Sequence, residues 1–235
     1  MKISILVPMY NEGNRVDNFF KHVIPFLKKN YKNWEILVVD DGSIDSTLEE
    51  IKKFSKKYKH ISVVSHKKNM GIGAGLKTGL KHVSGDIIIT MDSDLTYGVE
   101  NIPKLLDAMK EKNADVVIGT PFLKKNDHKE IPFVRYIASR GGNYIDQLLF
   151  GLNFTTSTCF FRAWNKCAAK NAKITFERFA GVPESIIRLH KNGFKIVETA
   201  VKYNLKRKSK KIKDIRMTIK NTTGHIRMLL RLLMT

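Results

Sequence analysis

Short apolar runs alternate with amphipathic stretches through the first 120 residues, and this alternation is the feature that most constrains the fold. The apolar runs predict five strands, at Ile3–Val7, Glu35–Asp40, Ile61–Ser65, Asp86–Met91 and Asp115–Gly119. The stretches between them predict helices, at 12–27, 43–57, 71–82 and 102–112. Strands that alternate with helices form a mostly parallel sheet with helices on both faces. We therefore predict an α/β fold.

Polar clusters follow four of the predicted strands. They are Tyr10-Asn11-Glu12, Asp40-Asp41-Gly42-Ser43, Asn69-Met70-Gly71 and Asp92-Ser93-Asp94. One acidic turn after a strand is commonly just a helix cap. The carboxyl ends of parallel strands, however, lie along one edge of a sheet, which is where α/β proteins bind ligands. Four clusters on one edge therefore predict a binding site.

Asp92 and Asp94 flank Ser93 directly after a buried strand. Two carboxylates this close repel each other unless a cation neutralises them. Hard oxygen ligands suit Mg²⁺ or Mn²⁺, which bridge protein carboxylates to substrate phosphates. The pair predicts such a metal site, and a turn carrying two solvated acids is the alternative.

The glycine-rich stretch Gly71–Thr78 is neither a P-loop nor a dinucleotide fingerprint. Leu76 and Thr78 stand where those motifs require glycine. We interpret the stretch as the start of a helix whose small residues allow close packing on the sheet.

The four clusters, in this order and at these spacings, resemble the inverting GT-A glycosyltransferases. The motifs are Pro8-Met-Tyr-Asn-Glu12, Val38-Val-Asp-Asp-Gly-Ser43, Asn69-x-Gly71 and Met91-Asp-Ser-Asp-Leu-Thr96. Within that family the chain is most similar to the polyprenyl-phosphate sugar transferases. The resemblance implies a GT-A fold and metal-dependent, inverting transfer of a hexose, mannose or glucose above all. The implied donor is a GDP- or UDP-hexose, and the implied acceptor is a polyprenyl phosphate of the dolichyl type.

The resemblance also implies roles for individual residues. The positions that match the family's nucleotide-binding residues are Pro8, Tyr10, Glu12, Val39 and Asp41. Those that match the residues around the metal and diphosphate are Asp92, Ser93, Asp94, Lys206 and Lys210. Asp92 and Asp94 are the implied metal ligands, and Asp94 is an implied catalytic residue.

The segment from Arg135 to Asn143 resembles the family's R-x-x-x-S-x-x-x-N motif. On a helix, Arg135, Ser139 and Asn143 lie roughly on one face. A guanidinium and a hydroxyl suit a phosphate, so the resemblance implies that Arg135 and Ser139 are catalytic residues at the lipid phosphate. A solvated basic helix face is the alternative.

The segment Thr156–Arg162 matches the family's D-x-T-S-G-F-R motif only in part. Thr156, Cys159 and Phe160 replace aspartate, serine and glycine. A catalytically inactive module that binds a nucleotide sugar therefore remains an alternative.

The middle third contains no Glu-Asp pair suited to act as a catalytic base. A sugar hydroxyl acceptor must lose a proton and needs a base, whereas a phosphate is already ionised. This absence favours a phosphate acceptor, and transfer to a hydroxyl acceptor stays as the alternative.

The chain has 42 Lys and Arg against 22 Asp and Glu, a net charge of +20, which predicts an anionic partner. Residues 202–235 hold eleven basic residues and one acid. They end in an apolar stripe of Ile226, Leu229, Leu230 and Leu233 beside Arg227 and Arg231. We predict a glycosyltransferase domain at 1–205 and a basic amphipathic extension at 206–235 that lies on an anionic membrane surface. Docking of these leucines on the core is the alternative.

Nucleic acid is the rival anionic partner. Binding of single-stranded nucleic acid requires aromatic side chains among the basic residues, on which the bases stack. After Lys202 the only Phe, Trp or Tyr residue is Tyr203. We therefore expect no nucleic-acid partner. Two cysteines indicate a reducing compartment, so we expect the protein on the cytoplasmic face of a membrane. It would be peripheral there, or anchored if the natural chain continues beyond Thr235.

Overall fold

The structure is a computed structural model that describes residues 1–124, 131, 133–203 and 215–234. The side chains of 133–135, 138 and 215–220 lie outside this description. The described residues form a sheet of seven strands in the order β3-β2-β1-β4-β6-β5-β7. The strands are β1 Ile3–Met9, β2 Trp34–Asp40, β3 Ile61–Ser65, β4 Ile87–Thr90, β5 Val116–Thr120, β6 Arg162–Asn165 and β7 Ile196–Ala200.

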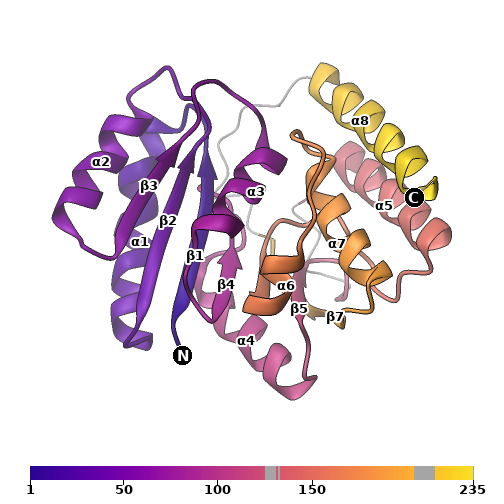
Figure 1. The fold of residues 1–235 in the computed structure, drawn as a ribbon, viewed down its shortest axis with the longest axis horizontal. Coiled ribbons are helices and arrows are strands. Elements are labelled where there is room, and N and C mark those ends of the chain that lie inside the picture. Colours follow the sequence, from indigo (N-terminus) through magenta and orange to yellow (C-terminus); the bar gives the residue numbers. More distant parts are fainter. Residues whose placement is uncertain (125–130, 132, 204–214, 235) are drawn as a thin grey trace.

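Helices cover both faces of this sheet, with α3, α6 and α7 in front of it and α1 behind it in Figure 1. The helices are α1 Gly13–Asn30, α2 Thr47–Lys57, α3 Ile72–His82, α4 Ile102–Glu111, α5 Phe133–Phe150, α6 Lys166–Asn171, α7 Gly181–Lys191 and α8 Ile215–Leu233. A short 3₁₀ helix, η1, spans Val99–Asn101 before α4. The predicted mostly parallel α/β architecture is confirmed, with β6 as an antiparallel strand between β4 and β5.

Several predicted boundaries differ from the observed ones, and two of these differences have a clear physical cause. β1 continues through Pro8 to Met9, because its pairing with β4 ends at Leu6 while its pairing with β2 continues to Met9. One side of Pro8 thus has no partner strand, so its missing N–H breaks no ladder. The second helix begins at Thr47 instead of Ser43. Its first residue is held by Asp45, whose carboxylate accepts the Thr47 N–H at 3.0 Å.

The glycine-rich stretch packs α3 closely on β1, as predicted. A Cβ added to Gly79 would lie 2.1 Å from a Leu6 methyl carbon, and one added to Gly75 would lie 2.9 Å from Pro8 Cβ. Larger side chains here would push the helix off the sheet, so these glycines set the depth at which α3 lies.

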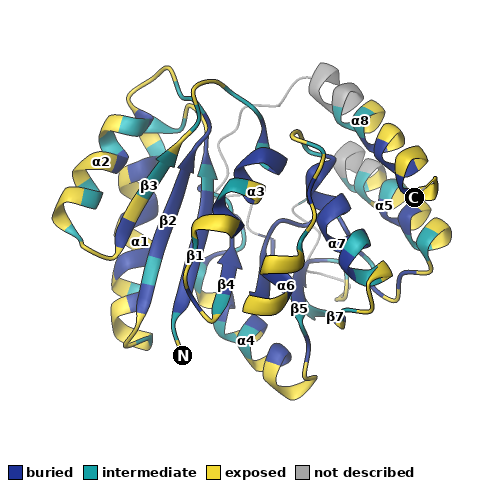
Figure 2. Cartoon of the chain, viewed as in Figure 1, coloured by how far each residue is buried: buried dark blue, intermediate teal, exposed yellow. Residues whose placement is uncertain are grey.

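The C-terminal helix α8 packs beside α5 (Figure 1) and contributes Met228, Leu229 and Leu232 to the core. Among its described side chains, the other large apolar ones, Ile226, Leu230 and Leu233, are exposed, and Figure 2 shows exposed residues along α8. The stripe expected from the sequence is therefore divided, because Leu229 faces the core. In the part of the chain that is described, no helix is long and apolar enough to cross a membrane.

Candidate active site

The segments that follow β1, β2 and β3 are joined to one another by hydrogen bonds. The Asn11 N–H donates to Ser43 Oγ, and the Ile44 N–H donates to Asn11 Oδ1, both at 3.0 Å. Thr47 Oγ1 accepts the Glu12 N–H at 2.8 Å. We call residues 10–13, 40–47, 66–71 and 92–96 the strand-end rim. Its first two segments form one unit, as expected for neighbouring strand ends.

Asp41 joins the second segment of the rim to the third. Its carboxylate accepts the N–H groups of Met70 and Gly71, at 2.9 and 2.7 Å. It also lies 2.7 Å from Nδ1 of His66, whose Nε2 lies 2.9 Å from the Thr78 hydroxyl on α3. The His66 and Asp41 side chains are only 9% and 5% exposed. A buried chain from α3 through His66 therefore fixes the Asp41 carboxylate.

The other residues predicted to bind the nucleotide differ in their exposure to solvent. Tyr10 is 41% exposed at the rim. Glu12 is partly buried and pairs with Arg15 of α1. Pro8 is partly buried at the end of β1. Val39 is 0% exposed in the core, so the structure does not bring its side chain to the surface with the others.

Asp92, Ser93 and Asp94 form a tight turn after β4. Asp94 Oδ1 accepts the Thr96 N–H at 2.9 Å and the Thr96 hydroxyl at 2.6 Å. Leu95, between them, has φ of +53°, a left-handed conformation that is uncommon for a bulky residue. Thr96 is 3% exposed, which makes it a buried support for the Asp94 carboxylate.

Two carboxylates suit a divalent cation whose remaining ligands come from a substrate. Magnesium is commonly bound by one or two carboxylates and by substrate phosphates. Among the described residues, no three His, Cys, Asp or Glu side chains are grouped to hold a metal ion. Oxygen atoms of a diphosphate and of water molecules would complete a site at Asp92 and Asp94.

The face of α5 predicted from the sequence meets the segment Thr156–Thr158. Asn143, which is 1% exposed, accepts the Ser157 N–H at 3.0 Å and the Thr158 hydroxyl at 3.2 Å. Its amide donates to Thr156 Oγ1 at 3.2 Å and to Ser139 Oγ at 3.4 Å. The helix and the T-S-T segment are therefore held as one unit.

Two members of this cluster were missed from the sequence. Asp146 is fully buried and accepts the Ser157 hydroxyl, and its Oδ1 lies 2.7 Å from Nε2 of His225 on α8. Asp146 lies one turn beyond Asn143 on α5, a spacing that could have indicated it. His225, 79 residues away, has no such signal. We call Ser139, Asn143, Asp146, the segment 156–158 and His225 the Asn143 network.

Arg162 and Glu198 anchor this network to the sheet. Arg162 is fully buried and donates to the carbonyl oxygens of Ser157 and Val182, while its Nε has no partner among the described residues. Burial lowers its pKa to about 9. Glu198 of β7 accepts the N–H groups of Thr155 and Thr156, and burial raises its pKa.

Three predicted residues cannot be placed with the rest. The backbone of Arg135 belongs to α5, but its side chain lies outside the described residues. Lys206 and Lys210 also lie outside them. Their roles remain predictions from the sequence.

Comparison with known proteins decides the family. Residues 4–171, which include both Asp92 and Asp94, match the family described as Glycosyl transferase family 2. The chain belongs to this family. It is a glycosyltransferase of the GT-A fold, and the expected kinship with polyprenyl-phosphate sugar transferases is confirmed.

Two relatives illustrate the kinship, and one solved structure illustrates the fold. This family 2 chain is 34% identical over 148 residues to a dolichol-phosphate mannosyltransferase of Pyrococcus furiosus, covering 63% of the chain and 41% of the relative. It is 33% identical over 183 residues to an undecaprenyl-phosphate 4-deoxy-4-formamido-L-arabinose transferase of Salmonella choleraesuis, covering 77% and 54%. The chain therefore spans about half the length of these relatives.

The solved structure is mannosyl-3-phosphoglycerate synthase from Rubrobacter xylanophilus, with a TM-score of 0.75 and 15% identity. The match covers 99% of this chain and 74% of that one. At this identity it supports the fold alone.

Proposed function

We propose that this glycosyltransferase transfers a hexose, with inversion, from a nucleoside diphosphate sugar to a polyprenyl phosphate, and that it requires Mg²⁺ or Mn²⁺. The observation that carries the proposal is the Asp92-Ser93-Asp94 turn at the strand-end rim, with Asp94 held by Thr96. Relatives named for dolichol and undecaprenyl phosphate support the acceptor class. A mannosyltransferase of the same fold from Pyrobaculum calidifontis was solved with GDP-Man and Mn²⁺, so GDP-sugars and Mn²⁺ are among the candidates to test.

On the donor side, the residues of the rim bind and orient the nucleotide. Tyr10, Glu12 and Asp41 hold the base and ribose, and Lys206 and Lys210 contact the diphosphate. Asp92 and Asp94 would hold the divalent cation, which would neutralise charge on the departing diphosphate. Because the Asp94 carboxylate is already fixed by Thr96, little reorganisation is needed when the substrate binds.

On the acceptor side, Arg135 and Ser139 of α5 bind the lipid phosphate. The anionic phosphate oxygen attacks the anomeric carbon from the face opposite the diphosphate. The new bond to carbon forms as the bond to the diphosphate breaks, so the configuration inverts. No general base is needed, because the attacking oxygen carries no proton at neutral pH.

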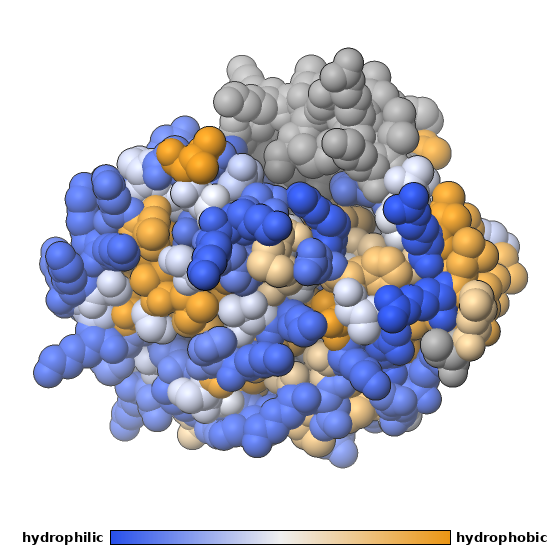
Figure 3. Space-filling view, turned by 45° about the horizontal axis from the view of Figure 1, so that its top comes forward, coloured by the Kyte–Doolittle hydropathy of each residue, from blue (hydrophilic) through white to orange (hydrophobic). Residues whose placement is uncertain are grey.

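A membrane surface with anionic lipids is the proposed location of the acceptor. Exposed apolar side chains gather on the outer faces of α5 and α8, and Figure 3 shows apolar surface at the right-hand edge, beside strongly hydrophilic side chains. Among the described side chains of these two helices, the large apolar ones that are exposed are Ile137, Tyr144, Ile145, Leu148, Leu149, Ile226, Leu230 and Leu233. Apolar side chains bordered by basic ones suit the headgroup region of such a membrane.

The test is transfer of labelled sugar to a short-chain polyprenyl phosphate. The assay uses the full chain with Mg²⁺ or Mn²⁺, a panel of GDP- and UDP-sugars, and EDTA as the control. We expect a metal-dependent lipid product from one donor. If GDP or UDP stabilises the protein but no donor reacts, transfer to a polyprenyl phosphate is refuted. A different acceptor or a role in binding alone would then take its place.

A further inference from the structure

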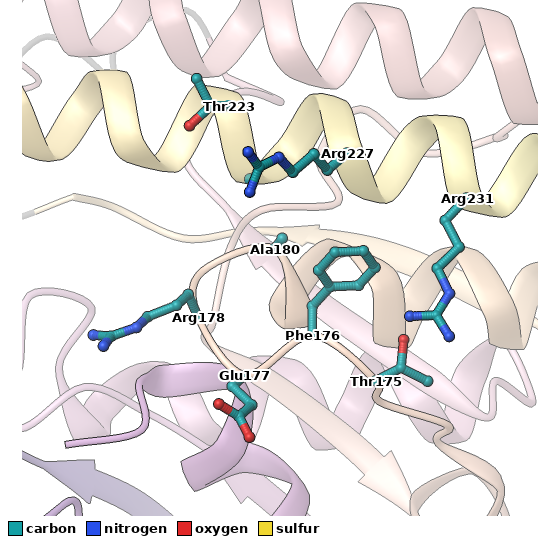
Figure 4. Close-up of a pocket in the computed structure, with 9 residues that line it drawn as sticks. Thr175, Phe176, Glu177, Arg178, Ala180, Thr223, Arg227 and Arg231 are labelled. Carbon is teal, nitrogen blue, oxygen red and sulfur yellow. The ribbon is translucent and has the colours of Figure 1, made fainter. Parts of the chain in front are cut away.

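A cleft separates α8 from the loop that precedes α7. Its volume is about 560 Å³, and its lining includes Arg178, Arg227 and Arg231. Volumes in this range are typical of sites for small molecules. Figure 4 shows Arg231 extending from α8 towards Thr175 and the Arg227 side chain lying along α8, with the Phe176 ring below the helix between them. The cleft is thus open to solvent on one side and bordered by guanidinium groups.

The walls of the cleft are held in place by buried contacts. Glu184 of α7 is fully buried and accepts the N–H groups of Thr175 and Phe176, at 2.7 and 2.9 Å. On the other side, α8 is held to α7 by Lys191, which donates to the Leu232 carbonyl at 3.0 Å. The cleft is therefore a feature of the folded chain with fixed sides.

Positive charge dominates the lining. Three arginines face a single acid, Glu177, whose side chain points away from α8 in Figure 4. Arg178 donates to Asn69 Oδ1 at 2.7 Å, and the Arg231 guanidinium lies 5.8 Å from the centre of the Phe176 ring. Such contacts hold the guanidinium groups in place, and a guanidinium can donate two parallel hydrogen bonds to one phosphate.

The residues of α8 form three parallel stripes along the helix. His225, Met228, Leu229 and Leu232 face the protein interior. Thr223, Arg227 and Arg231, each four residues apart, line the cleft. Ile226, Leu230 and Leu233 are exposed, and the helical repeat places this apolar stripe next to the arginine stripe. A ligand that joins a phosphate to hydrocarbon chains matches two neighbouring stripes of this kind.

We infer that the cleft binds the phosphate of an anionic lipid headgroup, while the lipid's hydrocarbon chains lie along the exposed apolar stripe of α8. This site is separate from the acceptor phosphate site proposed on α5. The inference rests on the proposed contact of α5 and α8 with a membrane. The bound lipid would orient the enzyme on the surface where its acceptor is found.

The experiment measures binding of the full chain to sedimented vesicles of phosphatidylcholine with and without phosphatidylglycerol. The variant Arg227→Gln/Arg231→Gln removes two charges from the cleft. The matched control Lys52→Gln/Lys56→Gln removes two exposed charges from α2. We expect the cleft variant to bind phosphatidylglycerol vesicles about 30-fold more weakly and the control less than about threefold. Equal losses would overturn the inference.

Three further measurements keep the result unambiguous. Arg227→Lys/Arg231→Lys retains the charge but lacks the planar fork, so we expect it to bind these vesicles better than the glutamine variant and less well than the unmodified chain. Circular dichroism melting checks that each variant is folded. Inorganic phosphate, titrated without vesicles, tests for a soluble ligand. If phosphate binding depends on the arginines but vesicle binding does not, the cleft serves a soluble phosphate compound and the lipid inference fails.

Transfer by the unmodified chain to a short-chain polyprenyl phosphate, without vesicles, tests the proposed function separately. If that transfer fails while vesicle binding still depends on the arginines, the proposed reaction is refuted and the lipid cleft stands.

Discussion

The strand-end rim and the Asn143 network are built in different ways. In the rim, backbone N–H groups meet side-chain oxygens of neighbouring strand-end segments, as where Asp41 accepts from Met70 and Gly71. In the Asn143 network, buried side chains from α5, the 156–158 segment and α8 contact one another. The comparison teaches that the rim follows from sheet topology, whereas the network depends on how separate elements pack.

Asp94→Ala removes the proposed metal ligand of the rim, and we expect it to have the largest effect on catalysis. Loss of a metal ligand should lower kcat about 100- to 1,000-fold. It also removes the acceptor of the buried Thr96 hydroxyl, so we expect the free energy of unfolding to fall by about 1 kcal/mol, which urea denaturation measures separately. The control Thr96→Ala keeps the carboxylate and removes one bond to it, so the loss should be about tenfold or less. An active Asp94→Ala enzyme would remove the metal hypothesis.

Asn143→Leu breaks the network instead. Ser157 and Thr158 would lose their shared acceptor in a buried site, so we expect the free energy of unfolding to fall by about 3 kcal/mol. Urea denaturation measures it. Asn153→Ala, in the same region but exposed, should change the free energy by about 0.5 kcal/mol or less. Equal effects would show that the network adds no stability.

A pair of glycine substitutions compares how tightly α3, which supports the rim, and α5, which carries the network, are packed at these positions. Gly79→Ala places a methyl group against Leu6 and should lower the free energy of unfolding by about 2 kcal/mol. Gly141→Ala, on α5, meets nothing within 4 Å and should raise it by about 0.5–1 kcal/mol through helix propensity. Thermal and urea denaturation of both variants measure these changes in the free energy of unfolding. A lower free energy of unfolding for Gly141→Ala would contradict the prediction.

His66→Ala tests whether the rim needs its buried support. Without the contact to His66, the Asp41 carboxylate is less well fixed, so we expect KM for the nucleotide sugar to rise about tenfold. We expect kcat and the acceptor KM to stay within about twofold, because His66 acts as a positioning residue through Asp41. His22→Ala, on the exposed side of α1, is the control. Equal rises in both KM values would point to a general structural role.

The smallest expected effect concerns the opposite end of the sheet, where Glu35 bonds to Lys2, Ser4 and Ser84. Burial opposes ionisation, but these bonds prevail and lower the pKa of Glu35 to about 2. Because the folded-state pKa is the lower one, the stabilisation is complete above the unfolded pKa of about 4.5 and is lost as the pH falls towards 2.

Glu35→Gln should therefore cost about 1 kcal/mol at pH 7, after allowance for solvent screening. Urea denaturation at several pH values measures the difference between variant and unmodified chain. The free energies of unfolding of the variant and the unmodified chain should converge near pH 2. A difference that stays constant with pH would contradict a lowered pKa for Glu35.

Most of the rim could be predicted from the sequence, because its motifs are contiguous and parallel strands bring their carboxyl ends to one edge. Asp92 and Asp94 follow β4 where the apolar pattern ends, and the glycines of α3 pack as their size indicated. The exact start of α2 could not be predicted. Ser43, Asp45 and Thr47 could each stand at the start of the helix. Which of them does so depends on the contacts of Ser43 with Asn11 and of Asp45 with Gly13 and Thr47.

By itself, the sequence determined the alternation of strands and helices, the strand-end motifs, the family resemblance and the basic C-terminal segment, since each depends on neighbours along the chain. Only the tertiary structure decided that His66 supports Asp41, that Asp146 meets His225, and that Leu229 faces the core while Arg227 and Arg231 line a cleft. These contacts join residues far apart in the chain. No local pattern encodes them, because they arise only when separate elements exclude water from the same space.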